Sequence, residues 1–186
     1  MSNEEIVYRI CLLGDRGVGK HNFLGRLLRD EYCSESNQTI QVSFGSRAIT
    51  ISDCDSDRDS KCHSNRSIRG QFWEIEQPPS RAIPSAYYRG AYGAFVVYDI
   101  SDRETFRHIE SDWLPELRNN ASECIRICIV GNKSDLALER QVSSEEGLAL
   151  ALKHKCLFIE TSALNSSHID TAFRQLLTVI HRQQSS

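Results

Sequence analysis

The sequence predicts an α/β fold, in which a doubly wound, mostly parallel sheet is covered by helices on both faces. Segments with strand patterns alternate along the chain with segments of helical periodicity. A glycine-rich loop separates the first predicted strand from the first predicted helix. Residues 94–98 are continuously apolar, as in a strand that is covered on both faces. In sheets of this class, ligand-binding loops follow the carboxyl ends of the strands.

The first half of the chain contains the less regular elements. Residues 6–13 form an apolar run typical of a buried strand, and helical spacing of apolar residues then predicts a helix from Lys20 to about Asp30. An irregular polar stretch follows this helix. Apolar and polar residues alternate over 40–52, which predicts a strand exposed on one side, at an edge of the sheet. Residues 53–66 are almost entirely polar and are interpreted as a mobile hairpin loop.

The second half has clearer boundaries. Pro78 and Pro79 end a strand over 68–75, since proline cannot continue a ladder of hydrogen bonds. Pro115 lies inside a predicted helix and is expected to kink it, and Ser143 begins another helix with a Ser-x-Glu-Glu cap. The remaining predictions are strands over 91–100, 125–130 and 156–159, and helices over 84–89, 102–119, 143–155 and 169–180.

Composition limits the class of protein. The 186 residues are 40% hydrophobic and contain no linker-like stretch or repeat, which predicts one domain over 1–186. The net charge of −3 gives no basic field that would attract nucleic acid or an anionic membrane. Seven scattered cysteines are interpreted as small buried hydrophobic residues in a reducing compartment. The polar N-terminus and the lack of an apolar run of about 20 residues predict a soluble, cytoplasmic protein.

The glycine-rich loop has the pattern G-x-x-x-x-G-K and predicts a phosphate-binding site. Glycines let backbone N–H groups surround phosphate oxygens, the following helix adds its positive N-terminal dipole, and a lysine supplies an ammonium group. The alternative is an ordinary glycine turn, which the flanking strand and helix make less favoured. The candidate residues are Gly14, Asp15, Arg16, Gly17, Val18, Gly19, Lys20, His21 and Asn22.

Two further motifs follow predicted strands. The first is Asn132-Lys133-Ser134-Asp135, in which the carboxylate of Asp135 can accept hydrogen bonds from the N1–H and the amino group of guanine. The second is Ser162-Ala163-Leu164, in which the backbone N–H of Ala163 would bind the guanine carbonyl. With the glycine-rich loop, these motifs resemble the signatures of the Ras superfamily of small GTP-binding proteins. Within it the chain is similar to Rab proteins, most of all to the recycling-endosome, Rab-eleven branch.

This resemblance covers residues 8 to about 182 and rests most strongly on 85–91, 97–100 and 158–164. It implies a P-loop NTPase fold, with a six-stranded, mostly parallel sheet, that binds GTP or GDP and regulates vesicle trafficking. Tyr32 matches an aromatic ring at the guanine edge, and Thr39 matches a ligand of Mg²⁺ and the γ-phosphate. Phe44, Trp73 and Tyr87 match the exposed aromatic triad that binds effector proteins. For these three, plain core packing is an equal alternative.

The sequence departs from the family around the γ-phosphate. His21 replaces the Ser or Thr that binds Mg²⁺, and imidazole is a poor ligand for this hard cation. The second-switch motif D-T-A-G-Q-E corresponds to residues 74–79, which contain no glycine. Aligned through Trp73 and Tyr87, this segment is one residue shorter than in the family and the gap has no unique place, so Gln77 is not assigned as the catalytic glutamine. Arg16 lies where small residues leave room for the attacking water. No catalytic residue is assigned, and Mg²⁺ is left open.

These departures lead to three hypotheses. In the first, the chain binds guanine nucleotide, hydrolyses GTP very slowly, and uses Arg16, Lys20 and protonated His21 in place of the metal charge. In the second, it is a pseudo-GTPase whose partner contacts do not depend on nucleotide. In the third, it is a working enzyme with unusual chemistry.

Two peripheral features bear on partners. The polar insertion at 53–66 contains Cys54, Cys62 and His63, whose spacing does not predict a metal site. The last residues lack the cysteines that Rab proteins prenylate. Membrane binding, on endosomes or vesicles, is therefore expected only through a lipidated segment outside this sequence.

Overall fold

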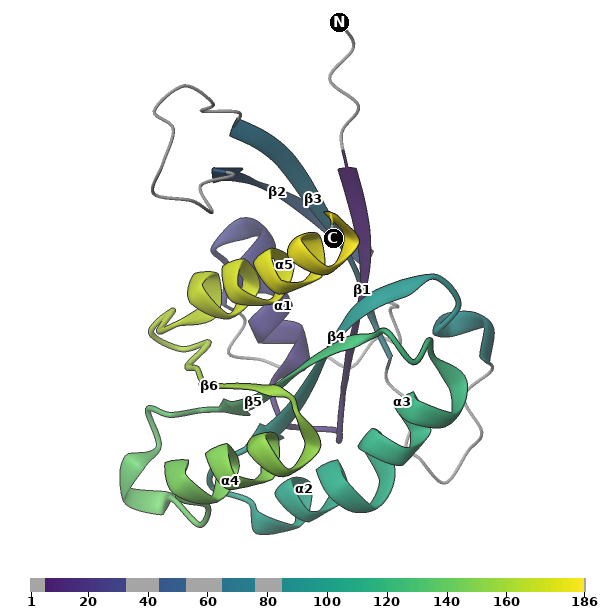
Figure 1. The fold of residues 1–186 in the computed structure, drawn as a ribbon. Helices are drawn as coiled ribbons and strands as arrows, with labels where there is room; N and C mark the ends of the chain where they lie inside the picture. The colour runs from purple at the N-terminus through teal and green to yellow at the C-terminus, as the bar shows by residue number, and fades with distance from the viewer. Residues whose placement is uncertain (1–5, 33–43, 53–64, 76–84, 186) are drawn as a thin grey trace, which may run out of the picture.

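The computed structural model describes residues 6–32, 44–52, 65–75 and 85–185. A six-stranded sheet runs through the molecule in the order β2-β3-β1-β4-β5-β6 (Figure 1). All neighbouring strands pair in parallel except β2, which is antiparallel to β3 at the edge. The strands are β1 Ile6–Gly14, β2 Phe44–Ser52, β3 Asn65–Glu74, β4 Ala91–Asp99, β5 Arg126–Asn132 and β6 Leu157–Glu160. The predicted fold class and the edge position of β2 are confirmed.

Helices cover both faces of this sheet. On one face α1 Lys20–Arg29 and α5 Ile169–Ser185 pack over a core that includes Leu12 and Phe95. On the other face lie α2 Arg103–His108, the π-helical segment η2 Ile109–Trp113, α3 Leu114–Asn120 and α4 Ser144–His154. Residues 94–98 are fully buried between the two layers, as their apolar run predicts. Two short 3₁₀ turns, Ser85–Tyr87 and Ala137–Glu139, complete the described elements.

Helix α4 begins as its sequence predicts. The Ser143 hydroxyl accepts a hydrogen bond from the backbone N–H of Glu146, and the Glu146 carboxylate accepts one from the backbone N–H of Ser143. This reciprocal capping box satisfies two N–H groups that the helix leaves without partners. The expected Ser-x-Glu-Glu cap is confirmed.

The helix expected over 102–119 is continuous but irregular. It contains the π-helical turn η2 immediately before Pro115, in which the backbone N–H of Leu114 donates to the carbonyl of Ile109, five residues earlier. Proline has no N–H to donate, so a wider turn here is physically reasonable. A change in the helix near Pro115 was expected, but a π turn was not.

The cysteines only partly follow the expectation of burial. Cys11 and Cys128 are buried and unpaired, and burial raises the pKa of the Cys11 thiol to about 12. Cys156 is half-buried, whereas Cys124 is exposed, so the prediction is wrong at that position. The polar loop at 53–66 falls almost wholly outside the described residues, as do Cys54, Cys62 and His63.

Candidate functional site

The glycine-rich loop joins β1 to α1 at the carboxyl edge of the sheet. Gly14, Gly17 and Gly19 have φ values of 139°, 84° and 91°. These positive φ values change the direction of the backbone at three points of the loop, and residues with a side chain disfavour them. Gly19 is also the N-cap of α1, and no side chain caps this end. The first turn of α1 therefore has the arrangement of an anion-binding nest.

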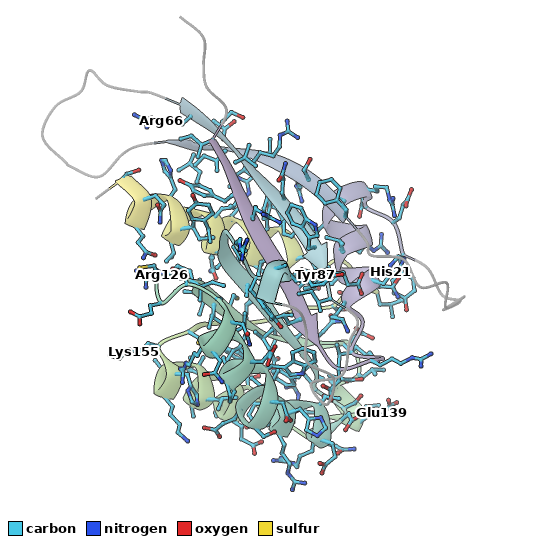
Figure 2. All side chains as sticks on the ribbon, turned by 90° about the vertical axis from the view of Figure 1, so that its right-hand side faces the viewer. His21, Arg66, Tyr87, Arg126, Glu139 and Lys155 are labelled. Atoms are coloured by element: carbon cyan, nitrogen blue, oxygen red, sulfur yellow. The ribbon has the colours of Figure 1, made fainter. Side chains whose placement is uncertain are left out.

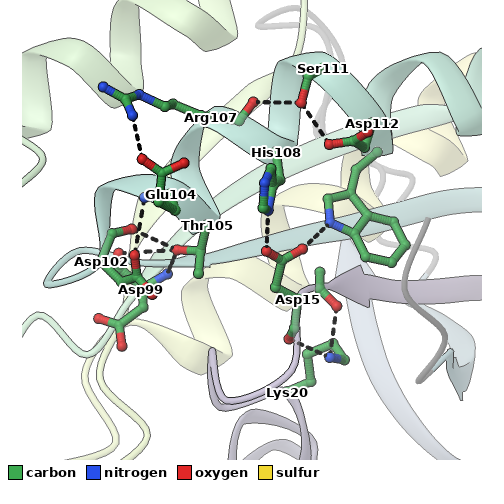
Figure 3. A network of polar contacts seen from close by, with 12 residues as sticks. Asp15, Lys20, Asp99, Asp102, Glu104, Thr105, Arg107, His108, Ser111 and Asp112 are labelled. Atoms are coloured by element: carbon green, nitrogen blue, oxygen red, sulfur yellow. Dashed lines mark hydrogen bonds and ion pairs between the residues drawn. The ribbon is translucent and has the colours of Figure 1, made fainter. Parts of the chain in front are cut away.

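Lys20 lies across this loop. Its side chain is almost buried, at 5% exposure, and Nζ donates hydrogen bonds of 2.8 Å to the carbonyl oxygens of Gly14 and Asp15 (Figure 3). A buried ammonium needs such partners, because an uncompensated charge inside a protein is costly. The contacts place the cation under the cradle that the sequence predicts for phosphate.

The carboxylate of Asp15 points away from the loop toward the helix that contains η2. Its Oδ1 accepts a hydrogen bond of 2.8 Å from Nε1 of Trp113, and its Oδ2 accepts one from Nδ1 of His108 (Figure 3). The hydrogen bond to Asp15 is the main cause that raises the pKa of His108. His108 and Trp113 were not predictable from sequence, because nothing in their spacing connects them with a loop almost 100 residues earlier.

The motif after β5 is bound to the glycine-rich loop. Nδ2 of Asn132 donates to the carbonyl of Val18 at 2.9 Å, and the Thr161 hydroxyl donates to Oδ1 of Asn132 at 3.1 Å. Nζ of Lys133 pairs with Asp99 at 2.6 Å. A methyl group on Gly19 would lie 3.9 Å from Cε of Lys133, so this side chain lies close to the loop. Asn132 and Lys133 thus hold the loop after β5 against the glycine-rich loop.

The motif after β6 completes this edge of the sheet. The Ser162 hydroxyl donates a hydrogen bond to Oδ1 of Asp135 and so orients the carboxylate proposed to bind guanine. Ala163 is buried and Leu164 is half-exposed. The structure therefore brings together the three segments 14–22, 132–135 and 162–164, which are far apart in the sequence.

Arg26 is a third residue of the site that the sequence did not point to. From α1 its Nε donates to the carbonyl of Ala163 at 2.8 Å, and its NH2 group donates to that of Leu164 at 3.0 Å. Its guanidinium also lies 5.6 Å from the centre of the Tyr32 ring. Arg26 therefore connects the first helix, the loop after β6 and the aromatic residue expected at the guanine edge. An arginine on the polar side of an amphipathic helix gives no sign of this role in sequence.

The region where the family resemblance implies Mg²⁺ contains a different contact. Nδ1 of His21 lies 3.8 Å from Oε2 of Glu74, whose side chain is 2% exposed, whereas that of His21 is 58% exposed. An imidazole beside a carboxylate suits a proton better than a hard cation that requires oxygen ligands. The described residues at this position therefore do not fit Mg²⁺. Thr39, the other expected ligand, lies outside the described residues, as does Gln77.

Arg16 and Asn22 occupy the two ends of the loop region. The Arg16 side chain is exposed, and Asn22 is half-buried in the first turn of α1. An exposed guanidinium beside a phosphate cradle can neutralise phosphate charge, and its size can obstruct an approaching water molecule. That Arg16 and Asn22 take part in phosphate binding remains a prediction.

The three aromatic residues are not core residues in the ordinary sense. Phe44 is 57% exposed and Tyr87 is 44% exposed, so plain core packing is wrong for both. Trp73 is half-buried, with its ring 4.8 Å from that of Phe44 and 4.4 Å from the guanidinium of Arg9. Figure 2 shows Tyr87 on the side of the molecule turned toward the viewer, in front of β1. The pair Phe44–Trp73 and the separate Tyr87 thus present aromatic surface to solvent.

The chain is similar to known proteins over most of its length. The model of the Ras family matches residues 9–182. The chain belongs to the Ras family and is a Rab small GTPase close to the Rab11 branch. It is 44% identical to Ras-related protein Rab-11A of Dictyostelium discoideum over 97% of this chain and 79% of that protein. It is 43% identical to Ras-related protein Rab11C of Lotus japonicus over 95% of this chain and 76% of that protein.

Membership in the Rab family implies that the chain binds guanine nucleotide. It also implies that the chain binds effector proteins. Among the helices that the structure describes, none is both long and apolar enough to cross a membrane.

Proposed function

We propose that this Rab-type protein regulates vesicle trafficking, binds GTP and GDP without the usual dependence on Mg²⁺, and hydrolyses GTP very slowly. The observation that carries the proposal is the contrast between the two ends of the site. At the base-binding end Ser162 orients the Asp135 carboxylate, whereas the metal end contains His21 beside Glu74. The effector surface is Phe44, Trp73 and Tyr87.

At the base-binding end, the polar groups are already oriented. Asp135 receives a hydrogen bond from Ser162, which leaves its second oxygen and remaining lone pairs to accept N–H groups of guanine. Adenine presents the opposite pattern at these positions, so the same carboxylate would repel it. Asn132 and Lys133 hold this loop against the phosphate cradle. Guanine binding therefore needs little rearrangement of these residues.

At the phosphate end, protein cations replace metal charge. Lys20 supplies an ammonium beneath the cradle, and Arg16 and His21 supply side chains at its margin. Hydrolysis in this family requires an oriented water and stabilised charge on the transferred phosphoryl group. Arg16 crowds the water position and no described residue is placed to orient it, so we expect hydrolysis slower than the roughly 10⁻⁴ per second of intact relatives.

Nucleotide release in EDTA tests the proposal. Wild-type protein loaded with a fluorescent GDP analogue is expected to release it at the same rate in excess Mg²⁺ and in EDTA. The double variant His21→Ser with Glu74→Asp restores the hydroxyl and the shorter carboxylate of intact relatives. In that variant we expect EDTA to accelerate release by about tenfold or more, since a cation on phosphate is worth several kcal/mol.

The paired design separates the possible outcomes. Accelerated release from the wild-type protein in EDTA would show that a metal is used despite His21, and would contradict metal independence. Absence of any nucleotide binding by the folded wild-type protein would contradict the function itself.

A second candidate is a scaffold whose partner contacts do not depend on nucleotide. It is favoured by the His21–Glu74 contact, which joins α1 to the end of β3 through protein atoms, directly beside Trp73. The chain has two tryptophans, Trp73 and Trp113, so the fluorescence of wild type and of Trp73→Phe isolates the signal of Trp73. We expect the Trp73 signal to differ between GDP and a non-hydrolysable GTP analogue. Identical spectra would favour the scaffold.

A further inference from the structure

The Asp15 carboxylate is held by two donors from one helical segment. His108 is the last residue of α2, and Trp113 is the last residue of the π-helical turn η2. They donate to different oxygens of the same carboxylate (Figure 3). Trp113 is fully buried, and a buried indole N–H requires an acceptor such as this one. The helix is therefore joined to the phosphate-binding loop through a bidentate contact.

The π turn accounts for this arrangement. Residues five apart in an α-helix point about 140° away from each other, whereas a π turn closes a wider loop and brings such residues closer to one face. The turn at Ile109–Trp113 begins directly after His108 and ends with Trp113, and it allows both donors to reach Asp15. Isolated π turns inside α-helices are frequent at functional sites.

The charge of Asp15 matters because of where its backbone lies. Its carbonyl accepts a hydrogen bond from Nζ of Lys20, and the next residue is Arg16. A carboxylate in such a loop repels the phosphates of a nucleotide unless it is turned away and neutralised. Trp113 turns it toward the helix, and a protonated His108 neutralises it.

The charged groups around His108 favour its protonated form. The hydrogen bond to Asp15 raises the pKa of His108 most, desolvation lowers it, and the charges of Asp15, Asp112 and Glu104 raise it further. Asp15 faces the ring from the phosphate-binding loop, and the other two carboxylates belong to its own helix.

We propose that His108 and Trp113 are positioning residues for nucleotide binding, which hold and neutralise the Asp15 carboxylate so that the loop accepts phosphate. This inference rests on the proposed binding of guanine nucleotide. It makes nucleotide affinity depend on the proton of His108. By reciprocity, bound nucleotide stabilises that proton and raises the pKa of His108 further.

The direction of the pH dependence follows from this charge. Below the ordinary histidine pKa, His108 is charged, and both nucleotide affinity and the stability due to the contact are complete. Since the pKa is raised in the folded protein, both contributions are lost as pH rises through that raised value. Nucleotide release therefore accelerates with pH. Because other charged groups line the same site, the contribution of His108 is the difference between wild type and a His108 variant.

The experiment measures the release of a fluorescent GDP analogue from about pH 5.5 to about 8.5. His108→Gln keeps a neutral donor for Asp15 but cannot be charged. We expect it to release nucleotide about five- to tenfold faster than wild type at low pH and at the same rate at high pH. His154→Gln is the matched control. His154, the last residue of α4, also pairs with a carboxylate, that of Glu110 in η2, but does not contact the glycine-rich loop. It should follow the wild-type profile.

A double-mutant cycle and a direct titration complete the test. In Asp15→Asn there is no charge to neutralise, so the further change His108→Gln should alter release by less than about twofold. The ring resonances of His108, followed by NMR, should show a pKa that rises when GDP is added.

The outcomes are distinct. A His108→Gln variant that releases nucleotide like wild type at every pH, or that loses thermal stability without a pH-dependent change in release, would overturn the inference while leaving nucleotide binding intact. The inference would also be overturned if His108→Gln had the same effect in Asp15→Asn as in the wild-type protein. A pKa of His108 that does not change when GDP is added would overturn it as well. A folded wild-type protein that binds no GDP analogue would overturn the proposed function and this inference together.

Discussion

Replacing Lys20 with alanine is expected to weaken guanine-nucleotide binding by roughly 30- to several-thousand-fold. Truncating one member of a buried, hydrogen-bonded charge pair typically costs about 2–5 kcal/mol, and each 1.4 kcal/mol is tenfold in Kd. Here the ammonium has two tasks, since it binds the carbonyls of Gly14 and Asp15 and carries the charge that phosphate requires. Titration of the variant with a fluorescent GDP analogue measures the loss.

Lys153→Ala is the control for this prediction. Lys153 is exposed and pairs with Glu110 on the opposite side of the sheet from α1, so its removal should leave nucleotide affinity unchanged. Circular dichroism establishes that both variants are folded. If Lys20→Ala binds nucleotide as tightly as Lys153→Ala, the glycine-rich loop is not the phosphate site.

Replacing Gly14 with alanine is expected to destabilise the protein by about 3–5 kcal/mol. A methyl group at this position would lie 2.2 Å from the carbonyl oxygen of Val97, a backbone atom of the neighbouring strand β4. The residue also has φ +139°, which an L-residue adopts only with strain. Strain and overpacking each cost about 1–3 kcal/mol. Urea unfolding would measure the loss, and Tm should fall by roughly 6–20 °C.

Gly17→Ala measures the cost of backbone strain without the steric contact that Gly14→Ala introduces. Gly17 also has positive φ, +84°, but a methyl group there would have no neighbour within 4 Å. Its cost should therefore be only the left-handed conformation, about 1–2 kcal/mol. Equal destabilisation in the two variants would mean that the approach of β1 to β4 at Val97 does not constrain residue 14.

The region where the family resemblance implies Mg²⁺ differs from the family at two positions whose side chains lie close together. His21 and Glu74 come from different elements, α1 and β3, and both differ from the residues that the family uses around Mg²⁺. In the structure the two side chains face each other at 3.8 Å. An imidazole and a longer carboxylate at neighbouring positions are chemically matched to each other, which a single loss of function would not require.

The elements of the fold could be predicted because local patterns determine them. Continuous apolar runs specify strands that are buried on both faces, and spacing of three and four residues specifies helices such as α1 and α5. The capping box at Ser143 was predictable for the same reason, since both partners lie within one turn. The π turn before Pro115 was not, because it depends on what the helix contacts as well as on its own sequence.

The sequence by itself determined the fold class and the family, and it predicted the phosphate-binding loop, the guanine motifs and the departures at His21 and in 74–79, because each is written in a short contiguous pattern. Only the tertiary structure decided which side chains support those motifs. Arg26 reaches Ala163, His21 faces Glu74, and His108 and Trp113 hold Asp15. These contacts join residues up to 137 positions apart, and their geometry exists only after parallel strands bring their carboxyl ends to one edge of the sheet.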